Sequence, residues 1–125
     1  MAVQLDHTIV HAHDRRVSAE FLAEVLGLAV GSPMGPFLPV DTGNGVTLDY
    51  YQTDGDFTPG HYAFLVPDEE FDTMIGRLER MRVTYFADPG HTEPGRINTL
   101  FGGRGAYFDD PSGHNMEIIT RPYAR

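Results

Sequence analysis

Hydrophobic and polar residues follow the same order in the two halves of this chain. Each half begins with a short strand-like run that carries a histidine near its start, at residues 5–10 and 60–66. An aspartate follows each histidine seven residues later (7 to 14 and 61 to 68) and introduces an amphipathic helical pattern. We therefore interpret the chain as an internal duplication.

Each half contains one predicted helix whose apolar residues recur on a single face. The first spans about residues 17–26 and stops at Gly27, and the second spans about residues 68–81 with Asp68 as its N-cap. The apolar faces consist of Phe21, Leu22, Val25 and Leu26 in the first helix, and of Phe71, Met74, Ile75 and Leu78 in the second.

Runs with strand character, bounded by Gly, Pro and Asp, follow each helix. They span residues 37–40 and 45–52 in the first half, and 83–87, 99–101, 105–109 and 114–120 in the second. Residues 110–113 contain a Pro and a Gly that suit a tight turn, and residues 31–35 and 88–96 are predicted loops. Each half thus reads as a strand, a helix and two or three further strands.

The period of two along a strand predicts which side chains converge. His61 lies on the face opposite the one that packs on the helix, and so does Glu117 in the last strand. A carboxylate flanked by Met116, Ile118 and Ile119 faces a large desolvation cost unless a positive charge compensates it. The chain has no lysine, and the nearest arginine comes at the strand end, so a metal cation supplies the missing charge.

His7 is the repeat-equivalent of His61, and with Glu117 it completes a candidate triad. The spacings of 54 residues (7 to 61) and 56 residues (61 to 117) place the three side chains on separate strands. Two imidazoles and one carboxylate leave open positions on one divalent ion, for which Fe, Mn, Ni and Zn are all suitable. A lone histidine on a strand is usually structural, but three such residues at repeat-related places favour a metal site. Asp49, the first-half counterpart of Glu117, is a fourth ligand, an outer-shell partner or an exposed residue.

Composition excludes several other classes of protein. The 125 residues suit a single domain, and 41% hydrophobic with 22% charged residues indicate a globular chain. A net charge of −9 repels a phosphate backbone, which argues against nucleic acid as a partner. No apolar run approaches the roughly 20 residues that cross a bilayer, and residues 1–6 show no signal-peptide pattern. We therefore expect a cytoplasmic location.

The residue types that are missing narrow the chemistry further. Cysteine and lysine are absent, which removes thiolate nucleophiles, disulfides and Schiff-base mechanisms. The three serines, Ser18, Ser32 and Ser112, do not lie in a nucleophile-elbow pattern. Histidines and carboxylates remain, and these serve metal and acid–base chemistry.

Four segments, at residues 5–8, 21–28, 60–64 and 105–117, resemble the vicinal-oxygen-chelate superfamily. This superfamily includes glyoxalase I, extradiol dioxygenases, fosfomycin-resistance transferases and bleomycin-resistance proteins. The resemblance implies an α+β fold in a single domain over residues 1–125. Module one spans about 1–55 and module two about 56–125, and the two βαβββ modules form a U-shaped half-barrel around the metal. It also implies a homodimer, a small-molecule substrate, and metal ligation at the positions of His7, His61 and Glu117.

Tyr107, ten residues before Glu117, matches the active-site tyrosine of extradiol dioxygenases. The histidine that shortly precedes that tyrosine in those enzymes is missing, and Asn98 lies near its place; His91 is a candidate substitute from the loop. In fosfomycin transferases a cation-binding loop precedes the tyrosine, but residues 101–105 read Phe-Gly-Gly-Arg-Gly here, and Ile9 replaces their threonine. These departures argue against fosfomycin chemistry.

Two hypotheses for the function follow. In the first, the protein is a metal-dependent enzyme acting on a vicinal-oxygen or phenolic substrate, either a glyoxalase-like lyase or isomerase or an extradiol-type dioxygenase. Tyr107 is then the acid/base or hydrogen-bond donor, His91 a proton shuttle, and Arg104 and Asn98 bind substrate, with glycines around Arg104 permitting close approach. In the second, it sequesters a drug or metabolite without chemistry, as bleomycin-resistance proteins do. Retention of all three ligands favours the enzyme.

Overall fold

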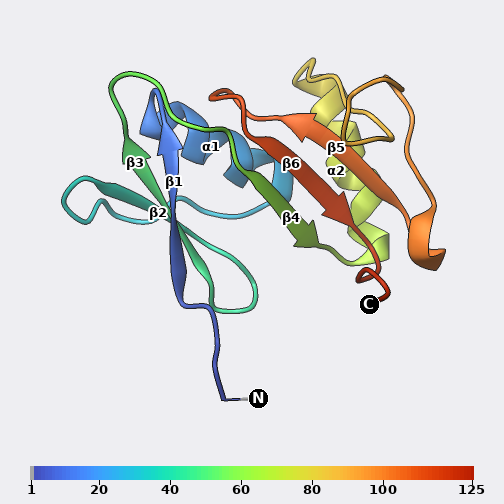
Figure 1. Ribbon diagram of the computed structural model, residues 1–125, viewed down its shortest axis with the longest axis horizontal. Helices are drawn as coiled ribbons and strands as arrows, with labels where there is room; N and C mark the ends of the chain where they lie inside the picture. The colour runs from blue at the N-terminus through green and yellow to red at the C-terminus, as the bar shows by residue number, and fades with distance from the viewer. Residues whose placement is uncertain (1) are drawn as a thin grey trace. The chain divides into compact units, whose positions relative to one another are not determined.

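The computed structural model describes residues 2–125 as two compact units, and the chain passes from one to the other between Thr58 and Pro59. Each unit contains one α-helix and one three-stranded mixed sheet (Figure 1). The predicted α+β class is therefore confirmed. In the part of the chain that is described, no helix is long and apolar enough to cross a membrane.

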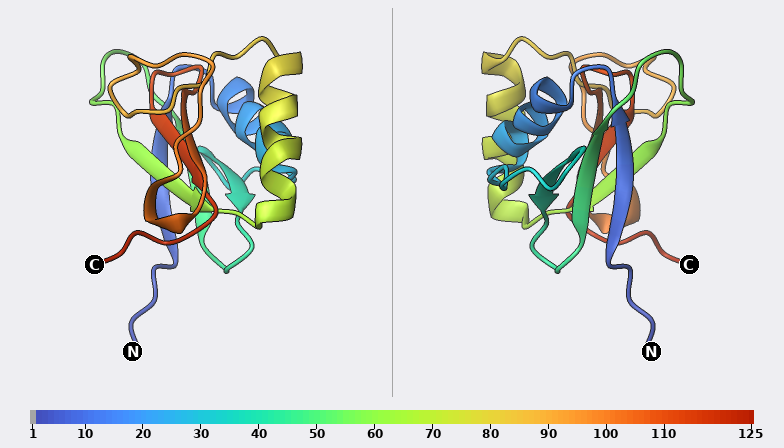
Figure 2. Two further views of the ribbon diagram at one scale, coloured as in Figure 1. Left: turned by 90° about the vertical axis from the view of Figure 1, so that its right-hand side faces the viewer. Right: turned by 90° about the vertical axis from the view of Figure 1, so that its left-hand side faces the viewer.

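The first unit is built on a sheet in the order β1-β3-β2, with β1 parallel and β2 antiparallel to the central strand. Its helix α1 packs against one face of this sheet (Figure 2). The elements are β1 (His7–Ala12), α1 (Arg15–Leu26), β2 (Phe37–Asp41) and β3 (Thr47–Gln52). The buried apolar side chains of the unit include Val10, Leu22, Val25, Leu38, Val40 and Leu48.

Helix α1 begins and ends where local chemistry predicts. The Asp14 carboxylate accepts hydrogen bonds from the backbone N–H groups of Arg16 and Val17, both at 3.1 Å, and so caps the first turn. Gly27 has a φ of 70°, a left-handed conformation that glycine adopts without steric cost, and it ends the helix. The predicted stop at Gly27 is confirmed, and the helix starts two residues before the predicted position.

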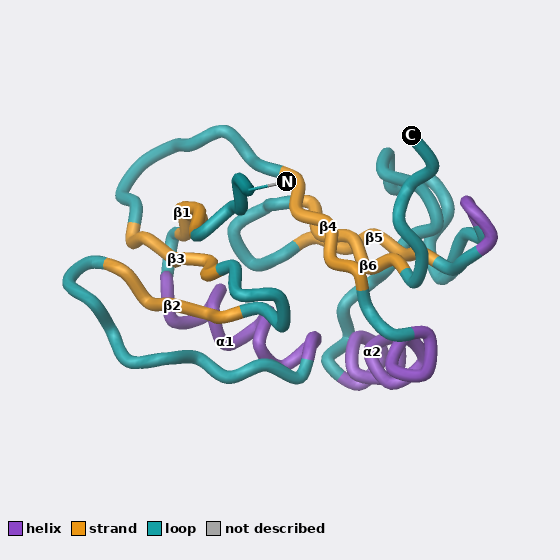
Figure 3. The backbone as a smooth tube through the Cα atoms, turned by 90° about the horizontal axis from the view of Figure 1, so that it is seen from below, coloured by secondary structure: helices purple, strands orange, loops and turns teal. Residues whose placement is uncertain are grey.

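The second unit repeats this plan with the order β4-β6-β5, in which β4 is parallel and β5 antiparallel to β6. Helix α2 runs along one face of the sheet (Figure 3). The elements are β4 (His61–Leu65), α2 (Asp68–Arg80), the short 3₁₀ helix η1 (Leu100–Gly102), β5 (Gly105–Asp109) and β6 (Asn115–Ile119). The core on the α2 side includes Phe71, Met74, Leu78, Phe108, Met116 and Ile118.

Two predicted strands of the second half do not form. Residues 83–87 contribute isolated bridges, from Phe86 to Tyr107 and to Pro94, in place of a continuous ladder. The Asp88 carboxylate accepts the backbone N–H groups of Thr92 and Glu93, so this segment turns instead of extending. Residues 99–101 enter η1, because Asn98 and Gly105 exchange backbone hydrogen bonds and close a short loop between them.

Asp68 is not the N-cap of α2 as the sequence predicted. Pro67 occupies the cap position without a side-chain hydrogen bond, and Asp68 is the first helical residue. Its carboxylate accepts a hydrogen bond from Arg104 Nε at 3.1 Å. Its negative charge also interacts favourably with the positive end of the helix dipole. The Asp68 carboxylate therefore pairs with a distant arginine and does not cap the backbone of its own helix.

Gly103 allows the end of β6 to approach the start of β5 closely. A Cβ atom at this position would lie 2.7 Å from Thr120 Oγ1 and 2.8 Å from Arg121 Cγ. Thr120 Oγ1 accepts a hydrogen bond from the Arg104 backbone N–H at 2.9 Å, so it does not move away freely. We expect Gly103→Ala to lower the free energy of unfolding by about 1–3 kcal/mol in urea titrations.

Gly43→Ala is the matched control for this change. A Cβ atom at Gly43 meets nothing within 4 Å, so its effect should stay within about 0.5 kcal/mol. Equal stabilities of the two variants would contradict the close approach at Gly103.

Candidate metal centre

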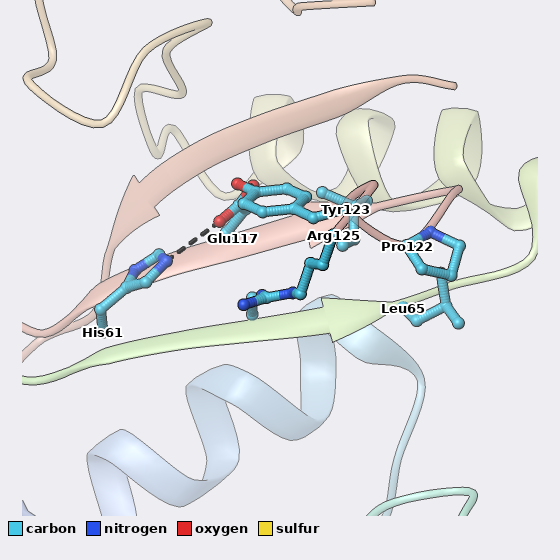
Figure 4. Close-up of a pocket in the computed structure, with 8 residues that line it drawn as sticks. His61, Leu65, Glu117, Pro122, Tyr123 and Arg125 are labelled. Atoms are coloured by element: carbon cyan, nitrogen blue, oxygen red, sulfur yellow. Dashed lines mark hydrogen bonds and ion pairs between the residues drawn. The ribbon is translucent and has the colours of Figure 1, made fainter. Parts of the chain in front are cut away.

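The candidate centre of the second unit is formed by Glu117 and His61 on adjacent strands. The register pairs Glu117 of β6 with Ala63 of β4 on one side and with Tyr107 of β5 on the other. The Glu117 side chain is 1% exposed, and its Oε1 lies 3.0 Å from His61 Nε2 (Figure 4). The two side chains therefore share one face of the sheet, as the strand period predicted.

The contact made by Nδ1, the other nitrogen of the His61 ring, determines which protonation states of the ring can face Glu117. His61 Nδ1 lies 2.9 Å from the backbone oxygen of Asn115, which only accepts hydrogen bonds, so Nδ1 carries a proton. Nε2 then has either a second proton or a lone pair directed toward the carboxylate. The second case is the tautomer in which the ring would ligate a metal ion, and the charge of such an ion would offset the repulsion between the lone pair and the carboxylate.

Two phenols complete the surroundings of Glu117. Tyr123 OH donates to Glu117 Oε2 at 2.5 Å, and Tyr107 OH lies 3.1 Å from Tyr123 OH. Burial raises the pKa of Tyr107 well above its usual range, and the hydrogen bond to Tyr123 and the Glu117 charge raise it further. Burial, followed by the hydrogen bond to Glu117, also raises the pKa of Tyr123. Both phenols thus keep their protons at neutral pH and act as donors.

Tyr123 is the site residue that the sequence interpretation missed. It follows Pro122, beyond the end of β6, so no strand period assigns it to a face. The one available signal was an aromatic residue six positions after a buried carboxylate, which is weak by itself.

A pocket of about 350 Å³ opens beside these groups. Figure 4 shows the Tyr123 ring beside the Glu117 carboxylate, with the His61 ring on the other side of that carboxylate. The lining residues are His61, Ala63, Leu65, Glu117, Ile119, Pro122, Tyr123 and Arg125. The pocket therefore combines a polar end with an apolar wall, and the C-terminal residues form part of it.

The first unit carries the other predicted ligand, His7, with its side chain 58% exposed. His7 Nδ1 lies 2.7 Å from Asp6 Oδ2; this hydrogen bond chiefly, and the charge of Asp49 to a lesser extent, raise the pKa of His7. Asp49 lies opposite Ile9 in the β1–β3 register. As in His61, the hydrogen bond occupies Nδ1 and leaves Nε2 as the ring nitrogen available to a partner.

Two imidazoles and a carboxylate are donor types that suit a divalent cation, but the three predicted ligands are divided between the units. Among residues 2–125, no three His, Asp or Glu side chains come close enough to hold a metal. Glu117 and His61 are adjacent in the second unit, and His7 belongs to the first. A shared ion at all three residues, with or without Asp49, remains a prediction.

Arg104 is directed to α2 and is not among the residues that line the pocket. Its guanidinium lies 2.7 Å from Asp72 Oδ1 and 4.6 Å from the centre of the Phe71 ring, in addition to its contact with Asp68. Hydrogen bonding to Arg104 lowers the pKa of Asp72. The expectation that Arg104 faces the cavity as an anion anchor is therefore corrected, because the two carboxylates and the aromatic ring hold it on the helix.

His91 and Asn98 attach the loop after α2 to the sheet. The His91 ring stacks on Phe86 with 4.2 Å between centroids, and its Nε2 lies 3.0 Å from Asn115 Oδ1. Asn98 donates from Nδ2 to the backbone oxygen of Ala87 at 2.8 Å. Neither residue lines the pocket. Their roles as proton shuttle and substrate contact stay predictions.

A family model described as the glyoxalase/bleomycin resistance protein/dioxygenase superfamily matches residues 4–118. The chain belongs to this superfamily. It is 59% identical to a solved structure named oxidase ChaP-H2, over 99% of this chain and 98% of that one, with a TM-score of 0.97. A second solved structure, oxidase ChaP-H1, is 55% identical over 99% of this chain and all of that one, with a TM-score of 0.95.

Glutathione transferase FosA of Serratia marcescens is a more distant relative. It is 29% identical over 94% of this chain and 81% of that protein. The match extends over both units, which agrees with the superfamily assignment.

Proposed function

We propose that this protein is a divalent-metal-dependent oxidase acting on a small phenolic or vicinal-oxygen substrate. The observation that carries the proposal is the buried Glu117 carboxylate, held between His61 Nε2 and the Tyr123 hydroxyl at the polar end of a pocket. The similarity to two proteins named oxidases favours oxidation over the lyase, isomerase and transferase reactions of the same superfamily.

His7, His61 and Glu117 would hold the ion, with Asp49 as a candidate fourth ligand. Once bound, a redox-active ion such as iron supplies Lewis acidity toward substrate oxygens and electron transfer to dioxygen. The homodimer implied by the family resemblance and the cytoplasmic location expected from the sequence stay predictions.

The chain's own residues give the pocket its selectivity. Ala63, Leu65 and Ile119 form an apolar wall that would bind the hydrocarbon part of a substrate and exclude water. Tyr107 keeps its proton because of burial, but it does not line the pocket and its hydroxyl lies 3.1 Å from that of Tyr123, so its role as acid/base or hydrogen-bond donor to substrate stays a prediction. This arrangement suits a substrate with neighbouring oxygens at the edge of an apolar skeleton.

Sequestration without chemistry is the second candidate function. The apolar wall favours it, because most small-molecule binding sites are largely apolar with a few placed polar groups. It differs from the oxidase in requiring neither a metal nor dioxygen.

Oxygen consumption tests the proposal directly. Untagged protein, reconstituted separately with Fe²⁺, Mn²⁺, Ni²⁺ and Zn²⁺, would be mixed with a panel of catechols and hydroquinones in an oxygen-electrode cell. We expect dioxygen uptake that needs a redox-active ion and falls by more than about 100-fold in His61→Ala, whose ring is a proposed ligand. The adduct of glutathione with an α-ketoaldehyde serves as the comparison substrate.

Three outcomes would change the conclusion. Turnover of the glutathione adduct without dioxygen uptake would replace the oxidase with a lyase. Tight binding of phenols by a protein that retains no metal would favour sequestration. Dioxygen uptake that is unaffected by His61→Ala would mean that the reaction does not take place at this centre.

A further inference from the structure

We infer that Tyr123 is a positioning residue of the metal centre, supplied by the C-terminal segment. It holds Glu117 so that one carboxylate oxygen faces His61 Nε2. This inference rests on the proposed metal-dependent function, and it assigns a role to a residue outside the sheets that carry the ligands.

The two oxygens of the Glu117 carboxylate have different partners. Oε1 lies 3.0 Å from His61 Nε2, and Oε2 accepts the Tyr123 hydroxyl at 2.5 Å, a length typical of an O–H donor to a charged acceptor. The terminal torsion of a glutamate is broad, so packing alone orients the carboxylate poorly. The hydrogen bond from Tyr123 selects the orientation in which Oε1 is presented on the His61 side.

Tyr123 is itself held by side chains, because it lies beyond the last strand. Tyr107 OH lies 3.1 Å from its hydroxyl, and the Phe101 ring stacks on its ring with 4.6 Å between centroids. Phe101 has a φ of 56°, a left-handed conformation that costs a bulky residue energy and is held here within η1. A strained residue is thus retained where its ring supports the phenol that contacts Glu117.

A hydrogen bond to a ligating carboxylate affects the metal directly. Partners of this kind orient the ligand, and their loss typically reduces metal affinity about 10- to 100-fold. A phenol that served folding alone would change stability without changing the dissociation constant of the metal. Metal affinity therefore separates a positioning role from a structural one.

The test compares Tyr123→Phe with Tyr85→Phe. Tyr85 OH also donates to a carboxylate, Glu79 Oε2 at 2.9 Å in the same unit, but neither residue lines the pocket. Each variant loses one phenol-to-carboxylate hydrogen bond and keeps its ring. Co²⁺ alone is the probe: its dissociation constant is measured by chelator competition, and its visible absorption bands report ligand geometry.

We expect Tyr123→Phe to raise the Co²⁺ dissociation constant about 10- to 100-fold and to alter the absorption bands, with Tyr85→Phe within about 2-fold of wild type. Phe101→Ala, which keeps the Tyr123 hydroxyl but removes its support, should give a smaller increase in the same direction. It also provides the test if Tyr123→Phe does not fold.

Unchanged Co²⁺ affinity in Tyr123→Phe, with tight binding by wild type, would overturn the positioning role and leave the oxidase proposal standing. Absence of Co²⁺ binding by the wild-type protein would overturn both. Equal losses in Tyr123→Phe and Tyr85→Phe would also reject the inference, because they would indicate a general effect on the fold.

Discussion

Glu117→Gln is expected to abolish tight metal binding while leaving the metal-free protein at least as stable as wild type. The carboxylate is 1% exposed, so its burial costs desolvation energy that its contacts only partly offset. A neutral amide of the same shape removes that cost, and His61, with 48% of its side chain exposed, can be solvated instead. The metal loses an anionic ligand, so its affinity should fall beyond the ~100-fold typical of outer-shell changes.

Thermal unfolding with and without metal measures both parts of this prediction. A ligand at 100 times its dissociation constant stabilises the native state by about 2.7 kcal/mol, so wild-type Tm should rise when metal is added. Glu117→Gln should start at an equal or higher Tm and show no rise.

Glu79→Gln is the control for this experiment, because Glu79 also accepts a tyrosine hydroxyl but does not line the pocket. It should respond to metal as wild type does. A Glu117→Gln variant that retains the metal-dependent rise would remove Glu117 from the ligand set.

Phe71→Ala is expected to lower the free energy of unfolding by about 3–5 kcal/mol. The Phe71 ring is fully buried in α2, on the side of the sheet away from Glu117, and the Arg104 guanidinium lies 4.6 Å from its centre. Truncation leaves a cavity and also removes the surface on which Arg104 rests. Denaturant titration of the metal-free protein gives the value.

Val17→Ala is the control, since Val17 is an apolar helical residue that is 51% exposed. Its effect should stay within about 0.5 kcal/mol. Metal should still stabilise Phe71→Ala by the wild-type amount, because the ligands are untouched. A loss below about 1 kcal/mol would mean that α2 does not depend on this ring.

The helices and the faces of the strands could be predicted because their causes are local. Asp14 caps the start of α1 and Gly27 ends it, both through contacts within a few residues. The apolar face of α2 that contains Phe71 follows from a period of 3.6. The period of two likewise placed His61 and Glu117 on a common face, and their 3.0 Å contact agrees with it. The superfamily could be recognised for the same reason, since its motifs are short and contiguous.

Arg104 shows where this reasoning failed. Its neighbouring glycines suggested a cavity, but Asp68 and Asp72, more than thirty residues earlier, hold its guanidinium on α2. The predicted strand at 83–87 failed similarly, because the Asp88 carboxylate binds the N–H groups of the following turn and limits Phe86 to isolated bridges. A periodicity does not show whether a polar side chain, nearby in the sequence or far from it, competes with the structure that the pattern favours.

The sequence by itself determined the duplicated order of elements, the two helices with their apolar faces, and the pairing of a histidine with a buried carboxylate. These depend on spacing and on the cost of burying charge, which one chain segment is enough to reveal. Tertiary structure alone decided that Tyr123 contacts Glu117, that Phe101 supports it in a strained conformation, and that Arg104 lies on α2. Those contacts join segments without a common period, so they exist only once the chain has packed.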